Sequence, residues 1–253
     1  MKRKIYFIIG LLLLCILRMS HGSHIVGGNF QLIQLSKGSA QFRLSLIMFF
    51  DEKNGNQQSK DLNITVGIFR KRDNVKMDEI TLPLNIESSV VYANQACADQ
   101  QSLKTLQFEY SKDIFLPPAT YNDPSGYFVV WERCCRNSVI TNINSPGATG
   151  QTFYLSFPPT TMNNSTPQFK SIDGEYICIG SNYKLLFDAT DPDGDQLSYR
   201  LVAPYKGTSN LNSPLGKYRF ALPLIWVLFH RQEHLHYVAI ENCNLDSGLF
   251  QVK

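Results

Sequence analysis

Beyond its first 22 residues, the chain has no apolar run long enough to cross a bilayer, for which about 20 residues are needed. It also has little net charge. Lysine and arginine number 24 against 21 aspartate and glutamate, and residues 1–22 hold four of the basic residues and none of the acidic ones. The remainder, with 20 basic against 21 acidic residues, offers no basic field for nucleic acid or an anionic membrane.

Complete catalytic sets are missing as well. Ile25-Val26-Gly27-Gly28 resembles the activated N-terminus of trypsin-like proteases, but the histidine, aspartate and serine of that family do not follow in its pattern. His230-Arg231-Gln232-Glu233-His234 matches the H-x-x-E-H pattern of inverted zinc peptidases, which needs a glutamate far downstream as third ligand. Only 19 residues follow His234, with Glu241 as the sole carboxylate candidate before Asp246. We therefore expect no catalysis from either string. We expect residues 25–28 to begin a first β-strand with a Gly-Gly bend, and residues 230–234 to form a solvated segment.

The first 22 residues have the layout of a secretory signal peptide. Lys2-Arg3-Lys4 precede an apolar run of 13 residues at 5–17, and Ser20 and Gly22 place small residues at −3 and −1 of a cleavage site. An uncleaved N-terminal anchor is the alternative. We predict cleavage after Gly22 or Ser20, and a protein that is secreted or lies on the cell surface.

Five of the six cysteines lie beyond this segment and are expected to oxidise after export. They are Cys97, Cys134, Cys135, Cys178 and Cys243. The odd number leaves one cysteine unpaired or paired between chains. Adjacent side chains on a strand point to opposite faces, so we expect Cys134 and Cys135 to bond different partners. No Cys-x-x-Cys pair is present, which argues against a zinc site.

The rest of the chain predicts strands and turns, without a long helical period. Residues 41–46 and 63–68 alternate polar and apolar side chains, as half-buried strands do, whereas the β-branched and aromatic run 127–131 suits burial on both faces. Residues 151–157 form another strand candidate, ended by Pro158-Pro159. Turn signals separate these runs at Asn54-Gly55, Asp123-Pro124-Ser125-Gly126, Pro146-Gly147, Asp173-Gly174 and Asp193-Gly194. The pattern predicts an all-β protein of tandem immunoglobulin-like or cadherin-like β-sandwiches.

A polar, proline-bracketed stretch at 158–167 predicts a boundary between two domains. The expected organisation is a signal peptide at 1–22, a β-sandwich at 23–160, a linker at 161–167 and an immunoglobulin-like or cadherin-like domain at 168–253. With 86 residues the last is shorter than a sandwich of roughly 100, so we expect it to be incomplete.

Four carboxylates lie within eight residues near the start of that second domain, at Asp188, Asp191, Asp193 and Asp195. Clustered carboxylates supply oxygen ligands of the kind that Ca²⁺ prefers. The spacing is not that of an EF-hand, because the glycine falls too early and Val202 stands where the bidentate glutamate belongs. Calcium is the one cofactor that we predict. The alternative is a polar turn whose aspartates bond their own backbone.

Five strings follow one another in the chain, at residues 23–28, 131–137, 146–150, 164–169 and 188–199. In order and spacing they resemble the N-terminal region of large surface proteins of gliding Bacteroidetes-type bacteria, known as gliding-motility-associated or PKD-domain proteins. The double-cysteine string Trp131-Glu132-Arg133-Cys134-Cys135-Arg136-Asn137 is the most specific.

This resemblance implies export through the type IX system, tandem sandwiches and an adhesive or structural role linked to gliding or surface attachment. It implies other surface proteins or glycans as partners, and no catalysis. The alternative function is that of an N-terminal accessory region of a secreted hydrolase.

Overall fold

The computed structural model describes residues 25–53, 60–92, 104–133, 149–170, 188–201, 205, 226–231 and 234–240. These ranges hold strands and one 3-10 turn, η3 (Thr160–Met162), without an α-helix, which confirms the predicted all-β class. The strands are β1 (Ile25–Gln34), β2 (Gln41–Asp51), β3 (Asn63–Arg70), β4 (Lys76–Ser89), β5 (Thr105–Phe115), β6 (Tyr127–Arg133), β7 (Gln151–Phe157), β8 (Gln168–Phe169), β9 (Ala189–Thr190), β10 (Ser198–Leu201), β11 (Trp226–Arg231) and β12 (His234–Ile240). No helix in this part of the chain is long and apolar enough to span a bilayer.

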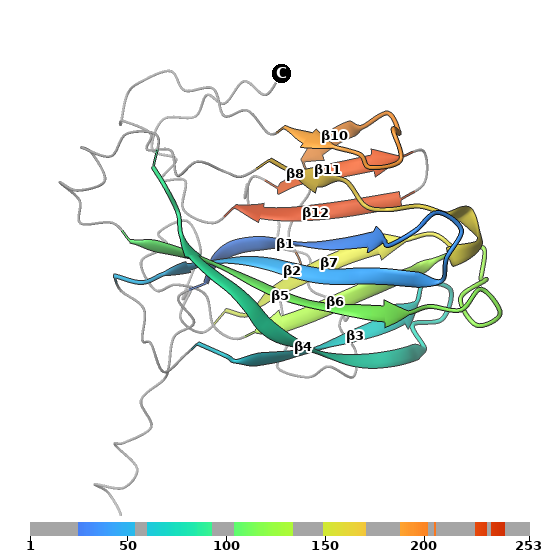
Figure 1. Cartoon of the computed structure of the whole chain (residues 1–253), viewed down its shortest axis with the longest axis horizontal. Helices are drawn as coiled ribbons and strands as arrows, with labels where there is room; N and C mark the ends of the chain where they lie inside the picture. Colours follow the sequence, from blue (N-terminus) through green and yellow to red (C-terminus); the bar gives the residue numbers. More distant parts are fainter. Residues whose placement is uncertain are drawn as a thin grey trace, which may run out of the picture.

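Ten strands form one antiparallel sheet that bends back on itself (Figure 1). Their order is β1-β2-β5-β4-β3-β6-β7-β12-β11-β10, and β12 also pairs with β1. The sheet is therefore nearly closed, as a β-sandwich or barrel-like fold. Its longest uninterrupted ladder joins β2 to β5, from Gln41↔Phe115 to Asp51↔Thr105. β8 and β9 form a separate two-stranded sheet.

Alternating side chains build the core between the layers. The predicted runs 41–46 and 63–68 lie in β2 and β3, and every second residue of β2 from Phe42 to Phe50 is at most 3% exposed. The prediction for 127–131 is also confirmed, because both faces of β6 are buried. Tyr127 and Val129 belong to the main core, whereas Phe128 and Val130 belong to a second apolar cluster on the other face.

The Ile25-Val26-Gly27-Gly28 string begins β1, as expected of a first strand with a Gly-Gly bend. The register with β2 shifts between Ile25 and Gly27. A Cβ on Gly28 would lie 2.2 Å from the carbonyl oxygen of Ile47, so only glycine allows the two backbones to approach this closely.

The segment predicted as a linker lies against β1. Asn164, Ser165 and Thr166 are at most 8% exposed. The amide of Thr166 donates to the carbonyl of Leu32, and the amide of Leu32 donates to Thr166 Oγ1, both at 2.9 Å. The polar side chains of the predicted linker thus supply acceptors for the edge of β1. Strands β10, β11 and β12, from the predicted second domain, join the same sheet as β1 and β7. The division into two domains stays a prediction.

Candidate functional site

Three of the four predicted calcium ligands converge in a turn between β9 and β10. Carboxylate oxygens of Asp191, Asp193 and Asp195 all lie within 4.8 Å of one another, the one such acidic group within the described ranges. The fourth predicted ligand, Asp188, instead forms an ion pair with Lys170. The turn therefore offers three carboxylates, part of the six to eight oxygens that Ca²⁺ takes.

Asp191 organises the backbone of this turn. Its Oδ1 accepts hydrogen bonds from the amides of Asp193, at 2.8 Å, and Asp195, at 3.3 Å. The amide of Gly194 donates to the carbonyl of Asp191 at 3.2 Å, and Gly194 has a φ of +81°. These bonds form the turn that we raised from the sequence as the alternative to a metal site, in which aspartates bond their own backbone.

A further bond ties the acidic turn to the first part of the chain. Oδ2 of Asp193 accepts from the amide of Ser165 at 2.5 Å. Because Ser165 Oγ also accepts from the amide of Gln34, at 3.2 Å, the turn is linked through residues 163–166 to β1. Asp193 therefore has a structural contact whether or not a metal binds.

The electrostatics of the turn favour proton or cation uptake. Burial raises the pKa of Asp191, and the neighbouring charges of Asp195 and Asp193 raise it further, although the two amide bonds act in the opposite direction. A cation near these carboxylates would relieve their mutual repulsion. Calcium at this turn stays a prediction.

A second organised aspartate turn precedes β6, where the sequence predicts a turn but not the contacts that the following tyrosine makes. The hydroxyl of Tyr127 donates to the carbonyl of Thr120 at 3.2 Å and accepts from the amide of Asp123 at 2.9 Å. This arrangement resembles the tyrosine corner of immunoglobulin-type sandwiches, in which the hydroxyl of a tyrosine near the start of a strand bonds the backbone a few residues upstream. The string Asp123-Pro124-Ser125-Gly126 by itself predicts only a turn. The tyrosine directly after it is the signal that points to these contacts.

Asp123 has only 8% of its surface exposed and is surrounded by donors. Its Oδ1 accepts from the hydroxyl and the amide of Ser125, at 2.6 and 3.0 Å. Its Oδ2 lies 3.3 Å from Arg72 Nη2 and 3.9 Å from Arg70 Nε. The bonds from Ser125, with help from the two arginines, lower the pKa of Asp123.

Only some of the remaining sequence-predicted sites lie among the residues that the structure describes. The signal peptide at 1–22 and the cysteines Cys97, Cys134, Cys135, Cys178 and Cys243 lie outside the described residues. The H-x-x-E-H string does not share one helix face, because His230 is in β11 and His234 in β12, with Arg231 opposite His234. The two histidines therefore lack the i, i+4 helical placement on which that zinc motif depends.

No model of a known protein family, no curated protein and no solved structure matches the chain. The resemblance to gliding-associated surface proteins is therefore carried by the motif strings alone. The fold defines the class: an antiparallel, nearly closed all-β protein with a sandwich or barrel-like sheet.

Proposed function

We propose that the chain is a non-catalytic secreted or cell-surface protein with an adhesive or structural role in surface attachment. The tyrosine corner before β6 is the observation that supports this most directly. It is a hallmark of immunoglobulin-type sandwiches, an architecture found in many cell-surface domains. Because a fold alone does not define a function, the proposal rests jointly on this corner and on the export signal and motif strings of the sequence.

Ion pairs link neighbouring segments of the described sheet. Arg43 on β2 forms a bidentate pair with Asp113 on β5, at 2.7 and 3.0 Å, directly opposite in the ladder. Lys60 pairs with Glu87, and Arg133 with Asp61. Each pair joins two segments of the sheet, so these side chains hold neighbouring strands together. Surface proteins or glycans are the partners that we propose, and attachment linked to gliding is the process.

The proposal is tested in the organism that encodes the chain. An epitope inserted after Lys253 would follow the protein through fractionation and protease treatment of intact cells. We expect the tagged protein outside the cytoplasm and accessible to protease, and we expect deletion of the gene to reduce attachment or spreading on a surface. A copy that lacks residues 1–22 serves as the matched control, because it should stay inside the cell and fail to restore attachment.

Two outcomes would overturn the proposal. One is a protein that remains in the cytoplasm with its first 22 residues uncleaved. The other is a deletion that leaves attachment intact and lowers a secreted hydrolytic activity, which would favour the accessory region of a hydrolase.

A further inference from the structure

Phe115, the last residue of β5, places an aromatic ring on the solvated face of the sheet. Its residue is 60% exposed, more than any other aromatic residue whose exposure the structure describes. The outward side chains that precede it on β5 are all polar, namely Thr105, Gln107, Glu109, Ser111 and Asp113. The outer face of a solvated antiparallel sheet is normally polar, so packing of the core does not account for a ring at this position.

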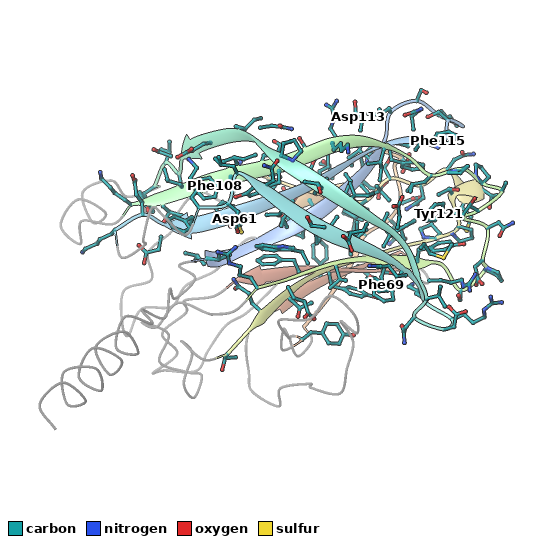
Figure 2. All side chains as sticks on the ribbon, turned by 90° about the horizontal axis from the view of Figure 1, so that it is seen from below. Asp61, Phe69, Phe108, Asp113, Phe115 and Tyr121 are labelled. Carbon is teal, nitrogen blue, oxygen red and sulfur yellow. The ribbon has the colours of Figure 1, made fainter. Side chains whose placement is uncertain are left out.

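Three polar side chains lie beside this ring on the same face. Gln41 is directly opposite Phe115 in the β2–β5 ladder, and the next outward pair is Arg43 opposite Asp113. Opposite side chains in a ladder have Cβ atoms about 5 Å apart, and outward neighbours along one strand are about 7 Å apart. The four residues, here called the Phe115 cluster, therefore form one compact patch. Figure 2 places Asp113 and Phe115 near one another, on the side of the sheet away from Phe69.

The charged pair of the cluster is held in place and still accessible. Arg43 Nε and Nη2 donate to the two carboxylate oxygens of Asp113, at 2.7 and 3.0 Å. The two side chains remain 53% and 46% exposed. A guanidinium has more N–H groups, and a carboxylate more lone pairs, than one bidentate pair uses. The pair can therefore bond a ligand as well, and because it is already ordered, binding costs little side-chain entropy.

The other members add an amide and a wider apolar surface. Gln41 is exposed, and its side-chain amide bonds no other residue in the ranges that the structure describes. Leu35 follows Gln41 in the same row, because its amide donates to the carbonyl of Gln41 at 2.9 Å, and it is 44% exposed. The hydrogen bond from Arg43 lowers the pKa of Asp113, so this carboxyl is an acceptor at neutral pH. The patch thus combines a ring, donors and acceptors with no net charge.

These groups match the chemistry of a sugar. A pyranose has C–H bonds on the faces of its ring, which lose contact with water when they pack on an aromatic side chain. The hydroxyls around its rim donate to a carboxylate and accept from a guanidinium or an amide. A neutral sugar fits best, because Arg43 and Asp113 cancel each other's charge and a charged ligand would face a like charge.

We propose that the Phe115 cluster binds a neutral glycan, with one sugar ring stacked on Phe115 and its hydroxyls bonded to Gln41, Arg43 and Asp113. This inference rests on the proposed role in surface attachment. It adds the chemical class of the partner and the surface of the sheet that holds it.

An array of oligosaccharides tests the proposal with the chain from Ser23 to Lys253, the form expected after cleavage. The array carries neutral fragments of dextran, mannan, galactan and chitin beside acidic and basic glycans. We expect binding to at least one neutral member, whose dissociation constant is then measured by titration calorimetry. Phe115→Ala should weaken that binding by about tenfold or more, because it removes the aromatic anchor. Asp113→Asn should weaken it by roughly fivefold, because a neutral acceptor forms a weaker hydrogen bond.

Leu62→Ala is the matched control, because it removes an apolar side chain that is 70% exposed outside the cluster. It should leave the dissociation constant unchanged. A further pair of variants covers the case in which Phe115→Ala disturbs the sheet. Phe115→Tyr keeps the ring and should retain binding, whereas Phe115→Leu keeps an apolar side chain without a ring and should lose it.

Four outcomes would overturn the inference: no binding to any neutral member of the array, binding to charged glycans only, equal binding by Phe115→Tyr and Phe115→Leu, and self-association of the parent through Phe115 without glycan binding. The last would assign the patch to a second copy of the chain. Failure of this inference differs from failure of the proposed function. A chain that is exported and needed for attachment but binds no neutral glycan contradicts the inference alone, whereas a glycan-binding chain that stays in the cytoplasm contradicts the attachment role.

Discussion

Two turns of the same sequence type lie in different parts of the molecule, Asp123-Pro124-Ser125-Gly126 and Asp191-Pro192-Asp193-Gly194. In both, Oδ1 of the first aspartate accepts from the amide two residues later, at 3.0 and 2.8 Å. In both, the glycine has a positive φ, +76° and +81°, and its amide donates to the carbonyl of that aspartate, at 2.9 and 3.2 Å. The local structure of the two turns is thus the same.

The charges that surround the first aspartate of each turn are opposite in sign. Asp123 faces Arg70 and Arg72, and its pKa is lowered, chiefly by the hydrogen bond from the Ser125 side chain. Asp191 faces two further carboxylates, and its pKa is raised, chiefly by burial. An Asp-Pro-x-Gly string therefore determines the path of the backbone, whereas the surrounding charges and burial determine whether the folded state favours the charged or the neutral carboxylate.

Replacing the glycine of each turn by alanine should give the largest difference in stability between the two turns. Both changes strain a positive φ, which costs about 1–2 kcal/mol. A Cβ on Gly126 would in addition lie 2.5 Å from the carbonyl oxygen of Phe157, whereas one on Gly194 meets no atom within 4 Å. We expect Gly126→Ala to lower the free energy of unfolding by roughly 3–5 kcal/mol and Gly194→Ala by about 1–2 kcal/mol. Urea unfolding checks both values, and equal losses would contradict the role given to Phe157.

Calcium should act on one turn only. If Asp191, Asp193 and Asp195 bind Ca²⁺, a hundredfold excess over the dissociation constant should stabilise the folded chain by about 2.7 kcal/mol. Magnesium should do less, because it demands tighter octahedral geometry. Thermal unfolding with calcium, magnesium or chelator measures the effect. Asp193→Asn should diminish the calcium response and Asp123→Asn should retain it. An unchanged melting temperature would leave the acidic turn as an ordinary polar turn.

Removal of one hydroxyl tests the corner that only the first turn has. Tyr127→Phe leaves the amide of Asp123 and the carbonyl of Thr120 without the hydroxyl that they contact. Loss of a buried hydrogen-bond partner costs about 1–3 kcal/mol, and we expect a loss in this range by urea unfolding. A loss below about 0.5 kcal/mol, the usual range of a surface substitution, would remove the tyrosine corner as a stabilising feature.

Acid titration gives the smallest effect, with opposite signs for the two turns. The lowered pKa of Asp123 contributes stability above the ordinary aspartate value of about 3.9, and this stability is lost as the pH falls through the folded pKa. The raised pKa of Asp191 contributes stability below about 3.9, which is lost as the pH rises through the folded pKa.

Unfolding midpoints in urea between about pH 2.5 and 7 separate these contributions. Asp123→Asn should flatten the loss of stability on acidification, whereas Asp191→Asn should flatten the loss as the pH rises above about 4. The two variants would sink this assignment if they changed the pH profile in the same direction.

The strands were the part of the fold most readable from the sequence. Residues 41–46, 63–68 and 151–157 were identified as strands, and burial of 127–131 on both faces followed from composition. The contact between Tyr127 and Asp123 spans four positions, so it could have been predicted from the local sequence. The bond between Leu32 and Thr166 spans 134 positions. Local composition does not reveal a partner at that distance, and it predicted a linker at 161–167.

By itself, the sequence determined the all-β class and the backbone of both aspartate turns. Alternation, proline, glycine and a short carboxylate side chain act within a few residues, so their effects do not depend on the rest of the chain. Only the tertiary structure decided that arginines lie beside Asp123, and that Asp188 pairs with Lys170 while three other carboxylates converge. It also decided that Phe69, Phe128 and Tyr154 are buried in a second apolar cluster, outside the main core. These outcomes depend on which strands lie side by side, and electrostatic and packing contacts act through space rather than along the chain.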